Sequence, residues 1–490
     1  MNIFLFHRDL RIQDNTALIY QLQELKEEII PIFIFPPEQI NQENNKYFSH
    51  NCVQFMIESL HELSESIKAK KGKLYFFKGD TIEVLKSLHK KNTINSIAYN
   101  IDYTPYALKR DTSIKEWCET EEITCFEKED YLLYDILEGQ TKKADNTPYL
   151  VFTPFRNHCY SNLEVRKVIK FNKYKFKKEK SLEKNKYYID DDSDGDSDGD
   201  SDGDGDNKLN NFYIDNPQIN VHGGRINGLN ILKTIKKFKD YNNKRDSLTY
   251  KTTFLGGYLK FGTISIREAY YAIGKILGFK CGLINELHWR DFYANITYEF
   301  PRVLQGQVKG NNKSFKEKYD NIKWSYDKKI FDKWCKGETG YPIIDSAMRQ
   351  LNTTGYMHNR CRMIVASFLG KDLHIDWKWG EKYFAQQLID YDPNSNSGGW
   401  QWANSNGTDA QPYFRIFNPW TQSKKFDTQC EYIKQWLPEL KNVPNKDIHN
   451  WYKPEVHELW LKNKIKYFKP IIDHDKERKI TLEIYKKALK

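Results

Sequence analysis

At 490 residues the chain is long enough for two or three domains and for a core that encloses a large cofactor, which argues against a single small domain. Its formal net charge is +10, yet residues 190–206 hold ten Asp and no Lys or Arg, so the other residues carry twenty more positive than negative charges. Such an excess favours a polyanionic partner, either nucleic acid or an anionic membrane surface, although an ordinary Lys-rich surface explains it equally well.

The eight Cys residues are scattered, with no CxxC pair and no spacing typical of a zinc or iron–sulfur site. We therefore expect no metal centre and a reducing compartment. No stretch approaches 18 uninterrupted apolar residues, and the first apolar run is too short for a signal peptide. These features predict a soluble, intracellular protein of the cytoplasm or nucleus. We also expect a monomer that does not act on a membrane.

Short apolar runs alternate with amphipathic stretches through the first 130 residues. The runs at 3–6, 29–35, 74–77 and 97–99 predict buried strands, and residues 53–68 predict a helix. This alternation predicts an α/β, Rossmann-like domain over residues 1–130, built on a parallel sheet covered on both faces. Neither GxGxxG nor GxxxxGK[ST] occurs here, so an ordinary dinucleotide or P-loop site is not indicated.

A connector is predicted over residues 131–225, where the alternation breaks down. Its Asp-Gly-Ser repeat at 190–206 cannot bury apolar area and its charges repel, so we expect a disordered loop there. From 226 to 490 the helical period returns and predicts a mainly α domain. Eleven of the twelve Trp residues lie after residue 280, which suits stacking on a planar ligand or a base as well as ordinary packing.

Polar side chains gather at the start of the predicted helical domain. Tyr241, Arg245, Thr252 and Thr253 precede a helix predicted to begin near Ser265. Hydroxyls and free backbone N–H groups suit a diphosphate, but Ser and Thr also cap helices in every class of protein.

The string NELHWRDFY at 285–293 has helical spacing that puts Glu286, Trp289, Arg290 and Tyr293 on one stripe. On one interpretation Glu286 and Arg290 form an ordinary surface ion pair. On the other, Trp289 stacks on a base, Glu286 hydrogen-bonds to it and Arg290 lies near a phosphate.

Two further segments carry chemically demanding residues. In GYMHNRCRMIVASFL, Asn359 and Met363 meet at i and i+4 with Arg362 beside them, and a buried Arg needs a partner such as Asp390 or Asp392. In LIDYDPNSNSGGWQW, Asp, Asn and Gly residues would let a ligand approach the backbone closely. An exposed Asn/Gly turn over 391–397 is the simpler interpretation, but it does not explain the WQW that follows.

Together these strings resemble the photolyase/cryptochrome family, and specifically class I cyclobutane pyrimidine dimer photolyases, over almost the whole chain. The shared motifs are HRDLRIQDN at 7–15, VFTPFRN at 151–157, NELHWRDFY at 285–293, WCKGETGYPIIDSAMRQLNTTGYMHNRCRM at 334–363 and WGEKYFAQQLIDYDPNSNSGGWQWANSNGTDAQPYFRIFNP at 379–419. The resemblance implies an α/β antenna domain, a long connector and a helical domain that holds FAD in a U shape.

The resemblance also implies a set of FAD-binding residues. Arg362 and Asp390 would pair beside the isoalloxazine, Asp392 would accept from the flavin or the ribose, and Asn396 would face flavin N5, where an amide favours the fully reduced, anionic flavin. Gly256 and Gly257 stand where the family often has Ser-Pro, so backbone N–H groups would replace one hydroxyl at the phosphates. The full set is Tyr241, Thr252, Thr253 and Leu255 around the diphosphate, with Asn359, Arg362, Asp390, Asp392 and Asn396.

The activity implied is light-driven repair of UV-damaged DNA, in which photoexcited reduced FAD passes an electron to a dimer flipped out of the duplex, the cyclobutane ring opens, and the electron returns. Flipping costs less at a damaged step, so the lesion contributes selectivity. The dimer would be bound by the bases' hydrogen-bond partners Glu286 and Asn359, by Met363, and by the stacking residues Trp289 and Trp402. Met363 stands where (6-4) photolyases place a His.

Two further sets complete the resemblance. The residues Trp324, Trp377 and Trp400 would pass electrons to oxidised FAD. The arginines expected at DNA phosphates, because the guanidinium fork suits the phosphodiester, are Arg245, Arg290, Arg360 and Arg415.

A second antenna chromophore is left open by the sequence. Tyr106 and Ala107 occupy the place where folate-binding photolyases often have Asn-Glu, and Glu43 stands where a His is expected. Methenyltetrahydrofolate, a deazaflavin, a second flavin and an empty pocket all remain alternatives.

Two other functions compete with repair. A cryptochrome-type blue-light photoreceptor shares the fold, but plant cryptochromes carry Asp where this chain has Asn396. A nucleic-acid binder without photochemistry fits the basic excess, but it leaves the flavin-type cluster unexplained.

Overall fold

The computed structural model describes residues 1–190, 208–307 and 311–490. Its sheet has the strand order β5-β4-β1-β2-β3-β6, with β1 to β5 parallel and β6 antiparallel to β3 at one edge. The strands are Asn2–Phe6 (β1), Ile30–Phe35 (β2), Tyr75–Lys78 (β3), Ser96–Asn100 (β4), Thr124–Lys128 (β5) and Tyr188–Ile189 (β6). The predicted α/β fold is confirmed, and the sequence missed only β5 and β6 among the strands of the described residues.

Both faces of the sheet are buried, as in parallel sheets generally. On β1, Ile3 and Leu5 belong to the apolar cluster that includes α4 and α5, whereas Phe4 and Phe6 belong to the cluster that includes α1 and α3. Helix α3 begins at His50, because the Ser49 hydroxyl accepts the Cys52 N–H at 3.2 Å. The helices of this domain are Thr16–Leu25 (α1), Pro37–Ile40 (α2), His50–Lys68 (α3), Thr81–Lys91 (α4) and Pro105–Thr120 (α5).

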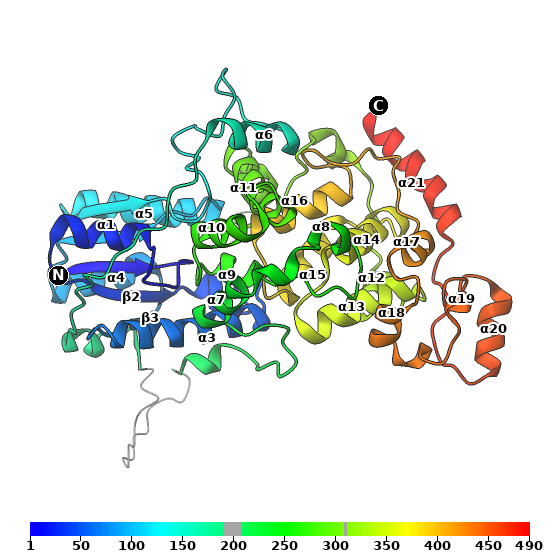
Figure 1. Cartoon of the computed structure of the whole chain (residues 1–490), viewed down its shortest axis with the longest axis horizontal. Helices are drawn as coiled ribbons and strands as arrows, with labels where there is room; N and C mark the ends of the chain where they lie inside the picture. Colours follow the sequence, from blue (N-terminus) through cyan, green and yellow to red (C-terminus); the bar gives the residue numbers. More distant parts are fainter. Residues whose placement is uncertain (191–207, 308–310) are drawn as a thin grey trace, which may run out of the picture.

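The predicted connector contributes to both halves of the molecule. Its β6 pairs with β3, with Ile189 opposite Phe76, and its α6 lies along α11 (Gly282–Glu299) of the helical domain (Figure 1). Apart from Asp190, the Asp-rich segment lies outside the described residues. The elements of the connector are Phe152–Asn162 (α6), Lys180–Lys184 (η1), Tyr188–Ile189 (β6) and Leu209–Phe212 (η3).

The remainder of the chain is helical, as predicted, and lies beside one end of the sheet (Figure 1). Helix α10 starts where expected: Ser265 and Glu268 form a reciprocal capping box at its first turn. The helices are Arg225–Lys233 (α7), Ile235–Phe238 (η4), Tyr241–Lys244 (α8), Gly256–Lys260 (α9), Ile266–Leu277 (α10), Gly282–Glu299 (α11), Pro301–Gln307 (η5), Glu317–Asn321 (η6), Lys328–Lys336 (α12), Pro342–Thr354 (α13), Asn359–Ser367 (α14), Phe368–Asp372 (η7), Trp377–Gln387 (α15), Pro393–Ala403 (α16), Pro419–Phe426 (α17), Glu431–Trp436 (α18), Pro438–Leu440 (η8), Asn445–Ile448 (α19), Pro454–Lys462 (α20) and His474–Leu489 (α21).

A buried ionic cluster joins the two halves. Arg267 of α10 donates from Nε to Asp14 at 3.0 Å and from Nη2 to Asp130 at 2.6 Å, and Arg11 donates to Asp130 at 2.5 Å. The side chains of these residues are at most 3% exposed. Burial alone would raise the pKa of Asp130, but Arg11 and Arg267 outweigh it and hold that pKa below its usual value. The cluster therefore fixes the sheet against the helical domain.

Within residues 1–190, 208–307 and 311–490, no helix is long and apolar enough to cross a membrane. Over the same residues, no group of three or more His, Cys, Asp or Glu side chains is placed to hold a metal ion.

Candidate functional site

Helix α14 presents two functional faces within two turns. Asn359, its first residue, is exposed and lies over Met363, with Nδ2 3.8 Å from Sδ. Arg362 lies on another side and donates from Nη2 to both Asp390 oxygens at 3.1 and 3.0 Å, and from Nε to the Met357 carbonyl at 2.8 Å. The sequence predicted both the Asn359–Met363 pair and a carboxylate partner for Arg362. The structure selects Asp390 for that role.

Gly256 allows the backbone to come close to Asp390. A Cβ at position 256 would lie 2.8 Å from Asp390 Oδ2, closer than real Cβ atoms come. Gly256 therefore gives the Arg362–Asp390 pair its room. Any larger side chain here would press on the carboxylate.

Asp392 is held differently from Asp390. It caps α16, accepting the Ser395 N–H at 2.9 Å, and its other oxygen accepts from Arg8 at 2.8 Å and from the Tyr131 hydroxyl. Burial would raise the pKa of Asp392, but Arg8 and Arg290 keep it below the usual range. The predicted contact from Asp392 to a flavin or ribose would therefore compete with these protein donors.

Asn396 is oriented by a buried acid. Its Nδ2 donates to the backbone carbonyl and to Oε1 of Glu381, both at 3.0 Å, so its Oδ1 stays available to a ligand. Glu381 is fully buried and its Oε2 has no partner in the described residues. Burial raises the pKa of Glu381 to about 8, although the Asn396 amide opposes the shift.

Replacing Glu381 by Gln should flatten the pH dependence of stability. An ordinary Glu ionises near 4.5, so between that pH and about 8 the folded wild type must either keep its proton or bury a charge. Wild type should lose stability relative to Glu381→Gln as the pH rises through this window, by at most about 1.4 kcal/mol for each pH unit. Urea denaturation midpoints measured across the window test this, with the exposed Glu483→Gln as control. Parallel profiles for wild type and Glu381→Gln would contradict it.

The residues of the stripe on α11 make different contacts, and Glu286 and Arg290 do not pair with each other. Glu286 accepts from Arg245 of the preceding segment at 2.8 Å, with both side chains nearly half exposed. The partial loss of water around its carboxyl group raises the pKa of Glu286, and Arg245 and the Tyr241 hydroxyl oppose the shift. The surface pair Glu286–Arg290 considered from the sequence is not formed.

Arg290 points into the protein. Its Nη1 donates to the Tyr131 carbonyl at 2.5 Å, its Nη2 to the Leu259 carbonyl at 3.1 Å, and its guanidinium lies 3.5 Å from the centre of the Tyr131 ring. A phosphate contact from Arg290, as expected from the sequence, would therefore have to compete with these two backbone carbonyls.

Trp289 is embedded in aromatic rings yet partly exposed. Phe152 of α6 stacks on it with ring centres 3.7 Å apart and an interplanar angle of 8°. Phe292 meets it edge-on at 5.7 Å, and Tyr293 lies 5.5 Å away. Trp402, the other residue expected to stack on the dimer, is also partly exposed.

Of the other arginines predicted to contact phosphates, Arg360 already has an acidic partner, whereas Arg415 has none among the described residues. Arg360 donates from Nη2 and Nε to Asp246 at 2.7 and 3.2 Å and lies 4.5 Å from the Phe426 ring centre. Arg415 is exposed and forms no ion pair with the described residues. A phosphate would therefore have to replace Asp246 at Arg360, whereas Arg415 is ready to bind one.

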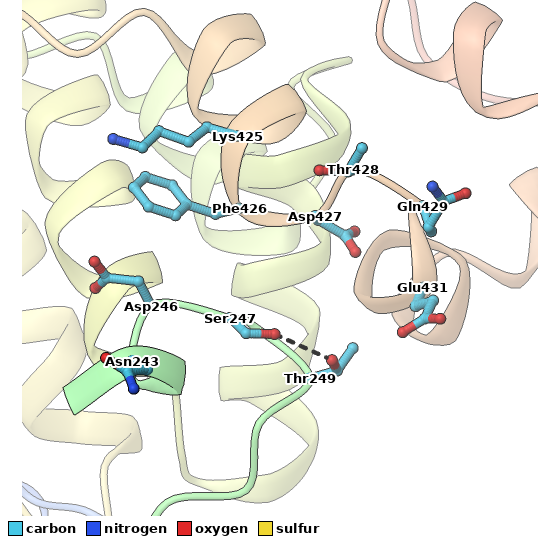
Figure 2. A pocket seen from close by; sticks show the side chains of 10 residues that line it. All are labelled: Asn243, Asp246, Ser247, Thr249, Lys425, Phe426, Asp427, Thr428, Gln429 and Glu431. Atoms are coloured by element: carbon cyan, nitrogen blue, oxygen red, sulfur yellow. Dashed lines mark hydrogen bonds between the residues drawn. The ribbon is translucent and has the colours of Figure 1, made fainter. Parts of the chain in front are cut away.

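A cavity of about 380 Å³ borders the Arg360–Asp246 pair. Figure 2 shows Asp246, Ser247 and Thr249 on one wall, and the residues from Lys425 to Gln429 together with Glu431 on the other. Because its acidic side chains outnumber the single Lys, the cavity does not suit a phosphate group.

The residues expected at the diphosphate lie around α8 and α9. Thr252 shares a hydrogen bond with the Tyr356 hydroxyl at 3.2 Å, and Thr253 accepts the Leu255 N–H at 3.5 Å. Tyr241 begins α8, and the Leu255 side chain is buried in the apolar core. A contact from Leu255 to a ligand would thus come from its backbone.

The three predicted electron-transfer Trp residues lie on successive neighbouring segments. Trp400 and Trp377 are buried, and a Cβ on Gly380, one turn after Trp377, would lie 2.1 Å from the Trp400 ring. The Ser325 N–H donates to the His374 carbonyl at 2.7 Å, which places Trp324 beside the segment leading to Trp377. Trp324 is partly exposed, so the order runs from the interior to the surface.

Sequence reasoning gave no role to four residues that shape this site: Arg8, Phe152, Asp246 and Glu381. Arg8 and Phe152 lie inside motifs that were recognised, but nothing in their spacing points to Asp392 or Trp289. Asp246 directly follows Arg245, and Glu381 follows Gly380, so only their three-dimensional partners reveal them.

The site has the features that FAD requires. It offers a guanidinium–carboxylate pair, two amides with open acceptor or donor groups, clustered hydroxyls and a backbone brought close by Gly256. This set suits a planar heterocycle with N–H and C=O groups joined to a diphosphate.

Comparisons with known proteins agree with this reading. Residues 2–172 match the family model "DNA photolyase", and residues 283–487 match "FAD binding domain of DNA photolyase". The deoxyribodipyrimidine photo-lyase of Alkalihalophilus pseudofirmus is 35% identical, covering 98% of this chain and 97% of that protein.

Two solved structures share the whole fold. The archaeal photolyase from Sulfolobus tokodaii, described with two FAD molecules, is 36% identical with a TM-score of 0.82 and covers 99% of this chain and 100% of its own. The class III photolyase from Agrobacterium tumefaciens is 28% identical with a TM-score of 0.81 and covers 100% and 97%.

Proposed function

This chain belongs to the DNA photolyase family, as a deoxyribodipyrimidine photo-lyase with FAD as its cofactor, and we propose that it uses light to repair cyclobutane pyrimidine dimers in DNA. The observation that supports the proposal most strongly is that α14 presents two sets of functional side chains on different sides. Arg362 and its partner Asp390 would hold the flavin, while Asn359 and Met363 would meet the dimer from the same two turns. The cofactor and the lesion would therefore lie against one rigid helix.

Reduced FAD, when bound and excited by light, supplies the electron that opens the cyclobutane ring and takes it back afterwards. The chain's own residues would bind the FAD and orient its flavin ring. Asn396, fixed by Glu381, would present Oδ1 to flavin N5. Tyr241, Thr252, Thr253 and Leu255 would surround the diphosphate, and Trp324, Trp377 and Trp400 would carry electrons inward from the surface.

The flipped dimer would stack on Trp289 and Trp402, whose partial exposure leaves ring surface available. Glu286 and Asn359 would hydrogen-bond to the bases, and Met363 would contact the ring carbons. Arg245, Arg360 and Arg415 would hold the flanking strand, after Arg360 exchanges Asp246 for a phosphate. Arg290 would join this set only by releasing the Tyr131 or the Leu259 carbonyl.

Light-dependent repair by the purified protein is the decisive test. Near-UV or blue light should split thymine dimers in an oligonucleotide back into thymines, and no dimer should be split in the dark. Bound flavin without repair would favour the photoreceptor, and the absence of both would end the proposal.

Glu286→Ala should slow repair at low DNA concentration about tenfold or more while flavin stays bound, since a hydrogen bond to a charged group contributes about 1.5–3 kcal/mol. Glu299→Ala is the matched control, because Glu299 lies at the far end of α11 and pairs with Lys142 at 2.9 Å. Equal effects of the two changes would contradict the role assigned to Glu286.

A further inference from the structure

We propose that Phe152 is a positioning residue for the lesion: it covers one face of Trp289 and so decides which face the flipped dimer can stack on. The inference rests on the proposed function, in which Trp289 stacks on the dimer. It gives the connector helix α6 a part in recognition.

The geometry of the pair is unusual for a core contact. Aromatic side chains in cores prefer offset or edge-on arrangements with ring centres about 4.5–7 Å apart. The ring centres of Phe152 and Trp289 lie 3.7 Å apart with an angle of 8° between the ring planes, so the two rings are superposed and Phe152 covers one face of the indole. A base can then stack only on the opposite face.

Phe152 itself cannot reach a bound dimer. Phe152 is only 5% exposed, and its ring lies flat against the Trp289 ring. Any effect of Phe152 on recognition must therefore pass through Trp289. This separates a positioning role from a direct contact.

The position of Phe152 is fixed from the segment that follows α16. Its N–H donates to Asp409 Oδ2 at 3.1 Å, and the Thr408 hydroxyl donates to the Leu150 carbonyl at 2.6 Å. Helix α16 carries both Asn396 and Trp402. The support behind Trp289 is thus tied to the helix that bears the other stacking residue and the flavin-facing amide.

The experiment compares dark binding of an oligonucleotide with one thymine dimer to binding of the same sequence undamaged, using FAD-loaded protein. Phe152→Leu keeps apolar volume but removes the flat ring. It should reduce the preference for the dimer about threefold to tenfold, the range that aromatic pairing contributes. Affinity for undamaged DNA and flavin content should not change, and Phe152→Tyr should stay within about twofold of wild type because it keeps the ring.

Phe155→Leu is the matched control, since Phe155 is 1% exposed on the same helix and packs on Phe292 at 5.5 Å without stacking on Trp289. Phe155→Leu should lower the free energy of unfolding about as much as Phe152→Leu does, but the variant should keep its preference for the dimer.

A double-mutant cycle decides whether Phe152 acts through Trp289. In a Trp289→Leu background, Phe152→Leu should cause no further loss of dimer preference. Additive losses, or equal losses for damaged and undamaged DNA, would overturn the inference and leave a packing role. A wild-type protein with no preference for the dimer would overturn the proposed function, and the inference with it.

Discussion

Arg362→Leu should deprive the protein of most of its FAD and, with it, of light-driven repair. Arg362 is the cation that Asp390 contacts through both oxygens, and Gly256 packs so closely that the carboxylate has little room to turn elsewhere. Truncating one member of a hydrogen-bonded charge pair costs about 2–5 kcal/mol, much of it the penalty on the partner left behind. We expect flavin affinity to fall roughly 30-fold or more.

Flavin absorbance per chain after gel filtration, followed by FAD titration of the stripped protein, measures this loss. Arg360→Leu is the control from the same helix, because Arg360 pairs with Asp246 rather than Asp390. It should retain flavin and weaken DNA binding. Similar flavin loss in both variants would mean that α14 had simply been disrupted.

Arg267→Met should destabilise the whole protein by about 3–5 kcal/mol, as expected when one partner of a buried ion pair is removed. Asp14 and Asp130 would keep their burial but lose the cation that joins them across the two halves. Because Arg11 and Arg267 hold the pKa of Asp130 below its usual value, this contribution is present above about pH 4 and is lost on acidification.

The measurement is the urea denaturation midpoint of FAD-loaded protein at neutral pH and at low pH. Arg302→Met removes an arginine that pairs with the surface residues Glu317 and Asp320, and should change stability by less than about 1 kcal/mol. The gap between the two variants should narrow at low pH. If Arg267→Met lowers the free energy of unfolding no more than Arg302→Met does, the buried ionic cluster does not hold the two halves together.

Much of the fold is local in origin and was predictable. The strand at 3–6 is apolar on both faces, and the helix over 53–68 repeats its apolar residues with the helical period. The two-residue β6 was missed because so short a strand has no period of its own, and it exists only because β3 offers an edge.

In the candidate site, too, the local contacts could be predicted from the sequence and the long-range contacts could not. Helical spacing placed Asn359 over Met363, and the cost of burying an unpaired charge required a carboxylate partner for Arg362. Spacing could not choose between Asp390 and Asp392, and it could not show that Arg8, at the other end of the chain, holds Asp392.

By itself the sequence determined the α/β and helical halves, the residues that share a helix face and, through the order of its motifs, the family. Only the tertiary structure decided the partners: Arg290 turned inward to Tyr131, Arg360 took Asp246, and Phe152 covered one face of Trp289. The physical reason is the distance along the chain between the residues that interact. Periodicity follows from backbone geometry over a few residues, whereas ion pairs and ring stacks depend on which distant segments the core brings together.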